Sequence, residues 1–307
     1  MRGFALGAFD SPPAVRDDLP EPEPIDGQVL VRVLASSANP VDAAIAAGML
    51  RDRFEHQFPV VIGRDFAGVV ERSGGGFAPG DEVMGFLPHA DPAVHAGAWA
   101  ELTAAGQFIA AKPAGIGFGE AGAASLAGIT ALVAVDAIEV AEGHTVLVIG
   151  ATGGVGSFAV QLAAGAGAHV IAPAFPEDEE YLRGLGVSER IEREADVVAA
   201  VRERHPEGID GLIDLVTYAP DQFAAHASVL KDGGRAATPV GAAGDEPGRF
   251  NVMGVADPGN AGRLASLLAA GDLRVPLQES YELERAGEAL EALTAKHVRG
   301  KTGIEVA

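Results

Sequence analysis

The segment His144-Thr-Val-Leu-Val-Ile-Gly-Ala-Thr-Gly-Gly-Val-Gly156 decides the fold that this chain is expected to adopt. Its β-branched and aliphatic first half predicts a buried strand over 145–149, and its second half is a glycine-rich turn. The apolar stretch 155–166 then predicts a helix, and the run 169–171 predicts a second strand. Strand, glycine turn, helix and strand in this order form the setting in which a dinucleotide-binding fingerprint acts.

The residues of the turn suit a pyrophosphate. Gly153 lets the backbone approach the phosphates, and Gly156 permits tight packing of the helix against the strand. The helix N-terminus adds unpaired N–H groups and a partial positive charge. The residues predicted to bind the nucleotide here are Ala151, Thr152, Gly153, Gly154, Val155 and Gly156, with alanine at the first glycine position. The competing interpretation is a strand-to-helix turn without a ligand.

The stretch Ala172-Pro-Ala-Phe-Pro176, after the predicted second strand, bears on which dinucleotide binds. An NAD site usually has an acidic residue there that holds the ribose 2′-OH. This stretch has none, so we expect NADPH, with NADH as the alternative because no lysine or arginine stands there either. Acidic residues follow at 177–180. Pro176 followed by acids predicts a helix start whose carboxylates face water.

Composition excludes several kinds of function. The 307 residues include no cysteine, which excludes disulfides, cysteine nucleophiles and cysteine-bound zinc. A net charge of −21 repels a phosphate backbone, so we expect no nucleic-acid partner. No run reaches the roughly 18 to 20 uninterrupted apolar residues that span a bilayer, and no secretory signal pattern opens the chain. We therefore expect a cytoplasmic protein with no membrane partner.

On both sides of the turn, the pattern of apolar residues, glycines and prolines predicts an α/β protein with two differently built domains. Before Pro113, short predicted strands are separated by glycine and proline, which is typical of a barrel-like domain. Their ranges are 28–34, 60–62, 67–70, 81–84 and 98–102. After Pro113, helices alternate with strands, which predicts a parallel sheet with crossover helices. We expect a split domain over 1–113 and 250–307, and a Rossmann-type domain over 114–249.

The remaining predicted elements follow the same reasoning. Helices are expected over 120–138, 155–166, 195–204, 261–270 and 284–296. Strands are expected over 145–149, 169–171, 211–216, 235–238 and 303–306.

Motifs outside the turn resemble the quinone oxidoreductase (zeta-crystallin-like) branch of the medium-chain dehydrogenase/reductase family, over nearly the whole chain. The matching stretches are Asn39-Pro-Val-Asp42, Pro59-Val-Val-Ile-Gly-Arg-Asp-Phe-Ala-Gly68, Gly80-Asp-Glu-Val-Met-Gly85, Gly97-Ala-Trp-Ala-Glu101, Gly128-Ile-Thr-Ala131 and Gly300-Lys301. The resemblance implies a GroES-like β-barrel domain, a Rossmann doubly wound parallel sheet domain, and a cofactor in the cleft between them. Members are commonly dimers, so a homodimer is expected.

The same resemblance implies further cofactor-binding residues. Asn39 and Thr130 would line the nicotinamide side of the cleft, and Arg193 stands where relatives place a residue near the 2′-phosphate. Arginine suits that role because it pairs bidentately with phosphate; the equal alternative is an exposed charge in the run 189–194. The other members of the predicted set are Val216, Val240, Gly241, Ala242 and Lys301.

No metal ligand is expected. Where zinc-dependent relatives have a cysteine and a His–Glu pair, this chain has Asn39 and Arg64–Asp65, which do not form a usual zinc site. Arg64 and Asp65 are interpreted as a structural ion pair or a backbone-holding aspartate rather than as catalysts. The histidines show no His-x-x-x-His spacing, and His89 and His95 fall in a proline-rich loop where a surface role is expected.

These features predict an NADPH-dependent reductase. Without a Lewis acid, hydride transfer suits an activated acceptor, a quinone or an α,β-unsaturated carbonyl. Asn39 is the candidate catalytic residue, as a hydrogen-bond partner of the carbonyl or ribose. The rival hypothesis is a non-catalytic NADPH-binding sensor or crystallin-like protein. A short-chain reductase is disfavoured because no tyrosine is followed four residues later by lysine.

Overall fold

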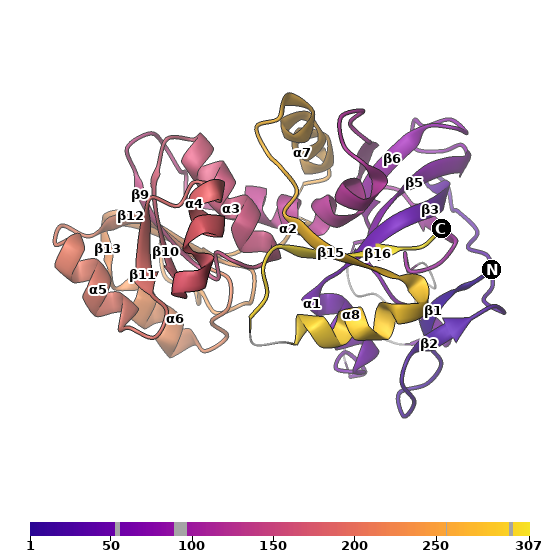
Figure 1. Cartoon of the computed structure of the whole chain (residues 1–307), viewed down its shortest axis with the longest axis horizontal. Helices are drawn as coiled ribbons and strands as arrows, with labels where there is room; N and C mark the ends of the chain where they lie inside the picture. The colour runs from indigo at the N-terminus through magenta and orange to yellow at the C-terminus, as the bar shows by residue number, and fades with distance from the viewer. Residues whose placement is uncertain (53–55, 89–96, 256, 295–296) are drawn as a thin grey trace. The chain divides into compact units, whose positions relative to one another are not determined.

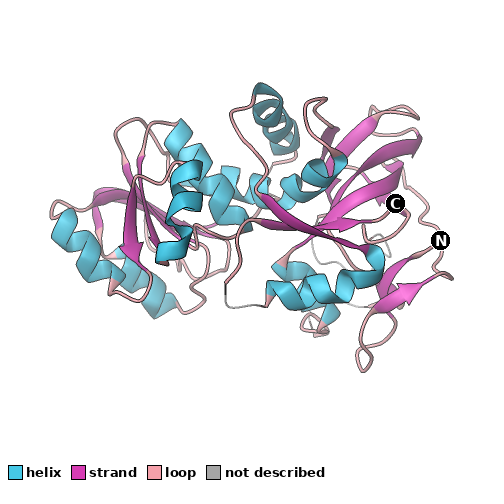
Figure 2. Ribbon diagram, in the orientation of Figure 1, coloured by secondary structure: helices cyan, strands magenta, loops and turns pink. Residues whose placement is uncertain are grey.

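The computed structural model describes residues 1–52, 56–88, 97–255, 257–294 and 297–307, and its helices and strands are drawn in Figures 1 and 2. The chain forms two compact units. The first comprises Met1–Leu126 with Asp257–Ala307, and the second comprises Ala127–Ala256. The first unit is therefore split in sequence, and the second is continuous.

The first unit is built on a sheet with the strand order β15-β16-β3-β5-β6-β8, in which β7 also pairs with β3. Its strands are β3 (Val29–Ala38), β5 (Asp65–Arg72), β6 (Glu82–Phe86), β7 (Leu102–Ala105), β8 (Ile109–Ala111), β15 (Leu277–Glu282) and β16 (Lys301–Glu305). Strand β16 runs antiparallel to β3, so the end of the chain, yellow in Figure 1, lies beside an indigo strand near its beginning. This pairing closes the split unit.

Among its described residues, the first unit also contains a smaller sheet and several helices. The sheet has the order β2-β1-β4, with β1 (Gly3–Leu6), β2 (Ala14–Arg16) and β4 (Val60–Val61). The helices are α1 (Pro40–Ala46), α7 (Gly259–Ala270) and α8 (Ala286–Leu293). One core cluster of this unit gathers around Trp99, whose side chain is fully buried among residues of β1, β4 and α8.

Strand β3 leads from the core to the candidate site. Its valines 29, 31 and 33 alternate with more exposed residues and pack in a core cluster, whereas its last residues are buried on both faces. Gly68 of β5 allows the two strands to approach, because a Cβ there would lie 2.0 Å from the carbonyl oxygen of Arg32. The antiparallel pairing places Asp65, the first residue of β5, beside Ser37 near the end of β3.

The second unit is a doubly wound parallel sheet, as predicted, with the strand order β11-β10-β9-β12-β13-β14. Its strands are β9 (Thr145–Ile149), β10 (His169–Ala174), β11 (Glu189–Glu192), β12 (Ile209–Asp214), β13 (Leu230–Thr238) and β14 (Arg249–Asn251). Its helices are α3 (Gly154–Gly165), α4 (Glu179–Leu185), α5 (Val197–Arg204) and α6 (Pro220–Ala227). Figure 2 shows α3 and α4 on one side of the sheet and α5 and α6 on the other.

Helix α2 (Phe118–Ala137) contains the division between the units, which falls after Leu126 rather than at the expected Pro113. The backbone N–H of Leu126 donates to Asp65, which ties the first turns of α2 to the first unit. The second division falls near 256 rather than 249, because β14 pairs with β13. By length and hydropathy α2 could cross a membrane, yet 72% of its most apolar window is buried inside the protein.

Several elements differ from the sequence-based expectation. The expected strand over 98–102 is a single bridge at Ala100, and β7 begins only at Leu102. The described part of the expected helix over 284–296 is α8 with a preceding 3-10 turn, and 295–296 lie outside the described residues. Elements that were not anticipated are β1, β2, β8, β11, β14, β15, α1 and α6. Most are short or lie at sheet edges, where few buried residues create a recognisable pattern.

Candidate functional site

The glycine-rich turn that is predicted to bind the nucleotide connects β9 to α3. Gly150 has a φ of +87°, and Gly153 is the N-cap of α3 with an extended backbone and no side-chain capping bond. A Cβ on Gly156 would lie 2.1 Å from the carbonyl oxygen of Gly150, so only glycine fits. Gly153, Gly154 and Val155 are partly exposed. The first N–H groups of α3 are therefore accessible to an anion, as the fingerprint predicts.

Two features of the turn were missed from the sequence. Gly150, not the aligned Ala151, is the residue in the left-handed region, and Ala151 is fully buried. Ser157 is the second: its hydroxyl lies 2.8 Å from the carbonyl oxygen of Gly153 and 2.8 Å from the Tyr181 hydroxyl. Ser157 thus ties the turn to α4. The side chain of Thr152 is buried beside it.

The carboxyl ends of the neighbouring strands β10 and β11 carry the residues that are predicted to set cofactor preference. The guanidinium of Arg193 lies 4.8 Å from the ring centroid of Phe175, and its backbone N–H donates to Ala174, the last residue of β10. Arg193 is exposed, so its position fits both the 2′-phosphate role and the surface-charge alternative. Of the acids after Pro176, three are exposed as expected, but Asp178 is fully buried, which corrects the prediction that all face water.

The carboxyl ends of β12 and β13 lie at the same edge of the parallel sheet as the glycine-rich turn. Asp214, the last residue of β12, accepts hydrogen bonds from the backbone N–H groups of Val216 and Thr217 and lies 2.8 Å from Nδ1 of His226. This buried aspartate shapes the loop in which Val216 is 55% exposed. After β13, Val240 and Gly241 are accessible at the edge, and Gly241 has a φ of +83°.

Two predicted residues of this unit have less open positions. Ala242 is 1% exposed and packs in the core of the sheet. Thr130 lies on α2, 8% exposed, and its hydroxyl would lie 3.0 Å from a Cβ on Gly254. The structure thus aligns Ala151–Gly156, Arg193, Val216, Val240 and Gly241 at the carboxyl ends of adjacent parallel strands, the edge where open α/β sheets bind nucleotides.

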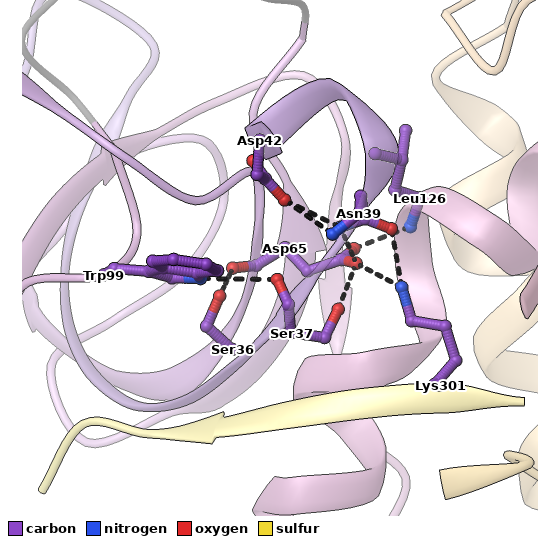
Figure 3. Close-up of polar contacts among 8 residues, drawn as sticks. All are labelled: Ser36, Ser37, Asn39, Asp42, Asp65, Trp99, Leu126 and Lys301. Carbon is purple, nitrogen blue, oxygen red and sulfur yellow. Dashed lines mark hydrogen bonds and ion pairs between the residues drawn. The ribbon is translucent and has the colours of Figure 1, made fainter. Parts of the chain in front are cut away.

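The first unit contains a separate buried polar cluster at the end of β3 (Figure 3). The Asn39 amide nitrogen donates to Asp42 at 3.2 Å and to Asp65 at 3.0 Å, and its oxygen accepts from the Lys301 ammonium at 2.6 Å. Lys301 also lies 3.3 Å from Asp65. None of the four residues is more than 5% exposed. Asn39 and Lys301, both predicted site residues, are therefore brought together from positions 262 residues apart.

Asp65 organises this cluster through both carboxylate oxygens. One oxygen accepts from the backbone N–H of Leu126 at 2.7 Å, and the other accepts from Ser37, Asn39 and Lys301. The backbone-holding interpretation of Asp65 agrees with this geometry. Arg64 donates instead to the carbonyl oxygen of Val61 at 3.2 Å.

Asp42 is the titratable member of the cluster. Complete burial raises the pKa of its carboxyl to about 6, with Asp65 adding to the rise while Arg64 and the hydrogen bonds from Asn39 oppose it. Its Oδ2 accepts from the Asn39 backbone N–H at 2.9 Å, which begins helix α1, whereas Oδ1 has no hydrogen-bond partner among the described residues.

The residues at the position of the zinc ligands of zinc-dependent relatives do not fit zinc. Asp65 is the only anionic ligand among Asn39, Arg64 and Asp65, and it already accepts four hydrogen bonds. The Lys301 ammonium stands beside it, where a divalent cation would be repelled.

The hydrogen-bond donors of Asn39 and Lys301 differ in how they are used. Both N–H bonds of the Asn39 amide are directed at carboxylates, whereas the Lys301 ammonium has a third N–H bond beyond its two acceptors. His89 and His95 lie outside the described residues.

Comparison with known proteins identifies the family. A model described as "Alcohol dehydrogenase GroES-like domain" matches residues 25–170, and one described as "Zinc-binding dehydrogenase" matches residues 154–261. The chain is 30% identical over 294 residues, 92% of its length and 73% of the relative, to the "NADPH-dependent alkenal/one oxidoreductase, chloroplastic" of Arabidopsis thaliana. The chain belongs to the medium-chain dehydrogenase/reductase superfamily.

The chain is also similar to quinone oxidoreductases of this superfamily. The chain is 32% identical over 212 residues to the "Chloroplast envelope quinone oxidoreductase homolog" of Arabidopsis thaliana, a match that spans 66% of this chain and 63% of that relative. The structure of a quinone oxidoreductase from Coxiella burnetii matches with a TM-score of 0.88 and 29% identity, covering 100% of this chain and 99% of that one. The expected GroES-like and Rossmann architecture is thereby confirmed.

Proposed function

We propose that this member of the superfamily is a zinc-independent, NADPH-dependent reductase that transfers hydride to a quinone or an α,β-unsaturated carbonyl. The observation that carries the proposal is the Asn39–Asp65–Lys301 network, which puts an ammonium beside the position of the zinc ligands in zinc-dependent members. A simple alcohol or ketone needs a Lewis acid to be polarised. An acceptor that is already conjugated does not, because its own carbonyl withdraws electrons.

The chain's own residues would bind and orient the reactants. NADPH, when bound, supplies the hydride, and the protein contributes position and electrostatics. The glycine turn with its accessible α3 N-terminus fits the pyrophosphate. In the first unit, Lys301 is buried among hydrogen-bond acceptors and keeps an ammonium N–H for an oxygen acceptor, a role that sequence reasoning assigned to Asn39.

Arg193 supports the preference for NADPH. Arg193 follows β11, and its guanidinium lies over the ring of Phe175. Phe175 directly follows the last residue of β10, where the ribose 2′ substituent lies in Rossmann-type sites. No acidic residue stands within 172–176 to bind a free 2′-OH. A guanidinium held on an aromatic face pairs well with a phosphate.

Titration of the purified protein with NADPH and NADH, followed by anaerobic turnover with a simple quinone and a simple enone, tests the proposal. We expect tighter binding of NADPH and its oxidation by at least one acceptor. Arg193→Ala should weaken NADPH binding about tenfold, a loss of about 1.4 kcal/mol, and leave NADH unchanged. Arg183→Ala, an exposed arginine on α4 paired with Glu179, is the matched control. Binding without turnover of either acceptor would favour the sensor hypothesis.

A further inference from the structure

A second cluster of ligand-type side chains lies at the opposite end of the parallel sheet of the second unit. His169 is the first residue of β10, Glu189 is the first residue of β11, and His205 is the residue directly after α5. The amino ends of the strands carry this cluster, whereas the nucleotide turn lies at their carboxyl ends. It is therefore separate from the proposed cofactor site.

The three side chains converge on one point. Oε2 of Glu189 lies 3.0 Å from Nε2 of His205 and 3.3 Å from Nε2 of His169. All three ligand atoms lie within 4.8 Å of one another. In a tetrahedral zinc site, bonds of about 2.0 to 2.2 Å put neighbouring ligand atoms about 3.3 Å apart. Two of the three separations already match this spacing, and a small rotation of the exposed His169 ring can shorten the third.

We propose that His169, Glu189 and His205 form a divalent transition-metal site, with zinc as the preferred ion. Two imidazole nitrogens and one carboxylate oxygen are a ligand set suited to zinc and unsuited to magnesium or calcium, which prefer oxygen alone. Three protein ligands leave room for water in the remaining position. The ion would link the starts of two strands to the end of a helix.

The surroundings hold the ligands in place. Arg204 donates to the other oxygen of Glu189 at 2.8 Å and to the carbonyl oxygen of Arg190, which turns Oε2 toward the histidines. The His205 backbone N–H donates to Val201 at 2.7 Å and fixes the end of α5. The side chains of His169, Glu189 and His205 are 43%, 19% and 22% exposed, so an ion can enter from solvent.

Nearby and overall charge have opposite effects on the binding of a cation at these three residues. The guanidinium of Arg204 opposes a cation and limits its affinity, whereas the net charge of −21 attracts cations to the surface. No metal ligand was expected from the sequence, in which no His-x-x-x-His spacing occurs. Only the pairing of β10 with β11 and the course of α5 bring them together.

The test uses untagged full-length protein, stripped with a chelator and titrated with Zn²⁺ against a competing zinc indicator. We expect one saturable site per chain. His169→Ala and His205→Ala should each weaken it at least tenfold, and Glu189→Gln should do the same while keeping the side-chain shape. His144→Gln is the matched control, a half-buried histidine at the same edge outside the ligand set, and should change the affinity less than twofold.

A second measurement checks that each variant is folded. Each variant is titrated with NADPH, which binds at the opposite edge under the proposed function, and circular dichroism is recorded. The wild-type protein loaded with Co²⁺ should show two histidine ring signals shifted by the metal in its NMR spectrum. Absence of a saturable zinc site in the wild type, or affinity that survives both histidine substitutions in folded protein, would overturn the metal site.

Discussion

Among single residues, Asp42 is expected to make the stability of the folded protein depend on pH. Its carboxyl has a pKa of about 6 in the folded protein, above the ordinary value of 3.8. The folded state therefore holds this proton more tightly than the unfolded chain does, and the contribution to stability is full below pH 3.8 and falls as the pH rises toward 6. At about 1.4 kcal/mol per pKa unit, the difference is worth about 3 kcal/mol.

Asp42→Asn removes this titration, so the stability of the wild type relative to the variant should fall between pH 4 and pH 7 by an amount of that order. Urea unfolding of both proteins across this range measures it. Parallel stability curves for the two proteins would contradict the raised pKa. Asp81→Asn, at an exposed turn, serves as the control for a general loss of negative charge.

The close approach of Gly156 to Gly150 leaves no room for a side chain at this position. A methyl group there would meet the Gly150 carbonyl oxygen at 2.1 Å, so Gly156→Ala must displace the turn from α3. We expect NADPH affinity to fall at least tenfold. Gly165→Ala, in the last turn of the same helix and with open space around its Cβ, should leave binding intact and stabilise the helix by about 0.5 to 1 kcal/mol. Fluorescence titration and thermal unfolding of both variants separate the two effects.

At the scale of elements, the hydroxyl pair Ser157–Tyr181 joins α3 to α4 beside the nucleotide turn. Tyr181→Phe removes this hydrogen bond and keeps the ring, so we expect a loss of about 1 kcal/mol in the free energy of unfolding. Tyr218→Phe is the matched control because Tyr218 is 71% exposed. Equal unfolding free energies for the two variants would show that the link between the helices contributes nothing.

Sequence reasoning succeeded best for elements with long, regular patterns. The strands β9, β10, β12 and β13 and the helices α2, α3 and α5 follow apolar runs within each segment. Strands such as β15, which is mostly exposed, and β14, which has three residues, exist because a neighbouring strand pairs with them. Their stability comes from distant partners, and no local pattern encodes it.

For the molecule as a whole, we expect that a destabilising substitution in one unit leaves the stability of the other unit unchanged. Lys301→Met leaves Asp65 buried without its cation, and breaking a buried ion pair in this way costs about 3 to 5 kcal/mol. Hydrogen exchange should quicken across β3 and β5 of the first unit, while the sheet of the second unit keeps its protection.

Lys231→Met is the control for that experiment. Lys231 pairs with Asp210 at the surface, where an ion pair is worth about 0 to 1 kcal/mol. Exchange that quickens equally in both units of Lys301→Met would show that the chain unfolds as one cooperative body, contrary to the expectation.

The position of the glycine-rich turn and the class of the fold follow from the sequence alone. Both depend on contiguous residues: a phosphate cradle is made from the backbone of one turn, and a strand or helix follows the period of its own apolar residues. The absence of cysteine could also be read directly from the chain.

Which groups share a site depends on the tertiary structure. Lys301 meets Asn39 because β16 pairs with β3, and Glu189 meets two histidines because β11 pairs with β10. Burial, which raises the pKa of Asp42, likewise depends on the packing of segments far apart in the chain. Such contacts are set by strand order, and strand order is a property of the folded chain as a whole.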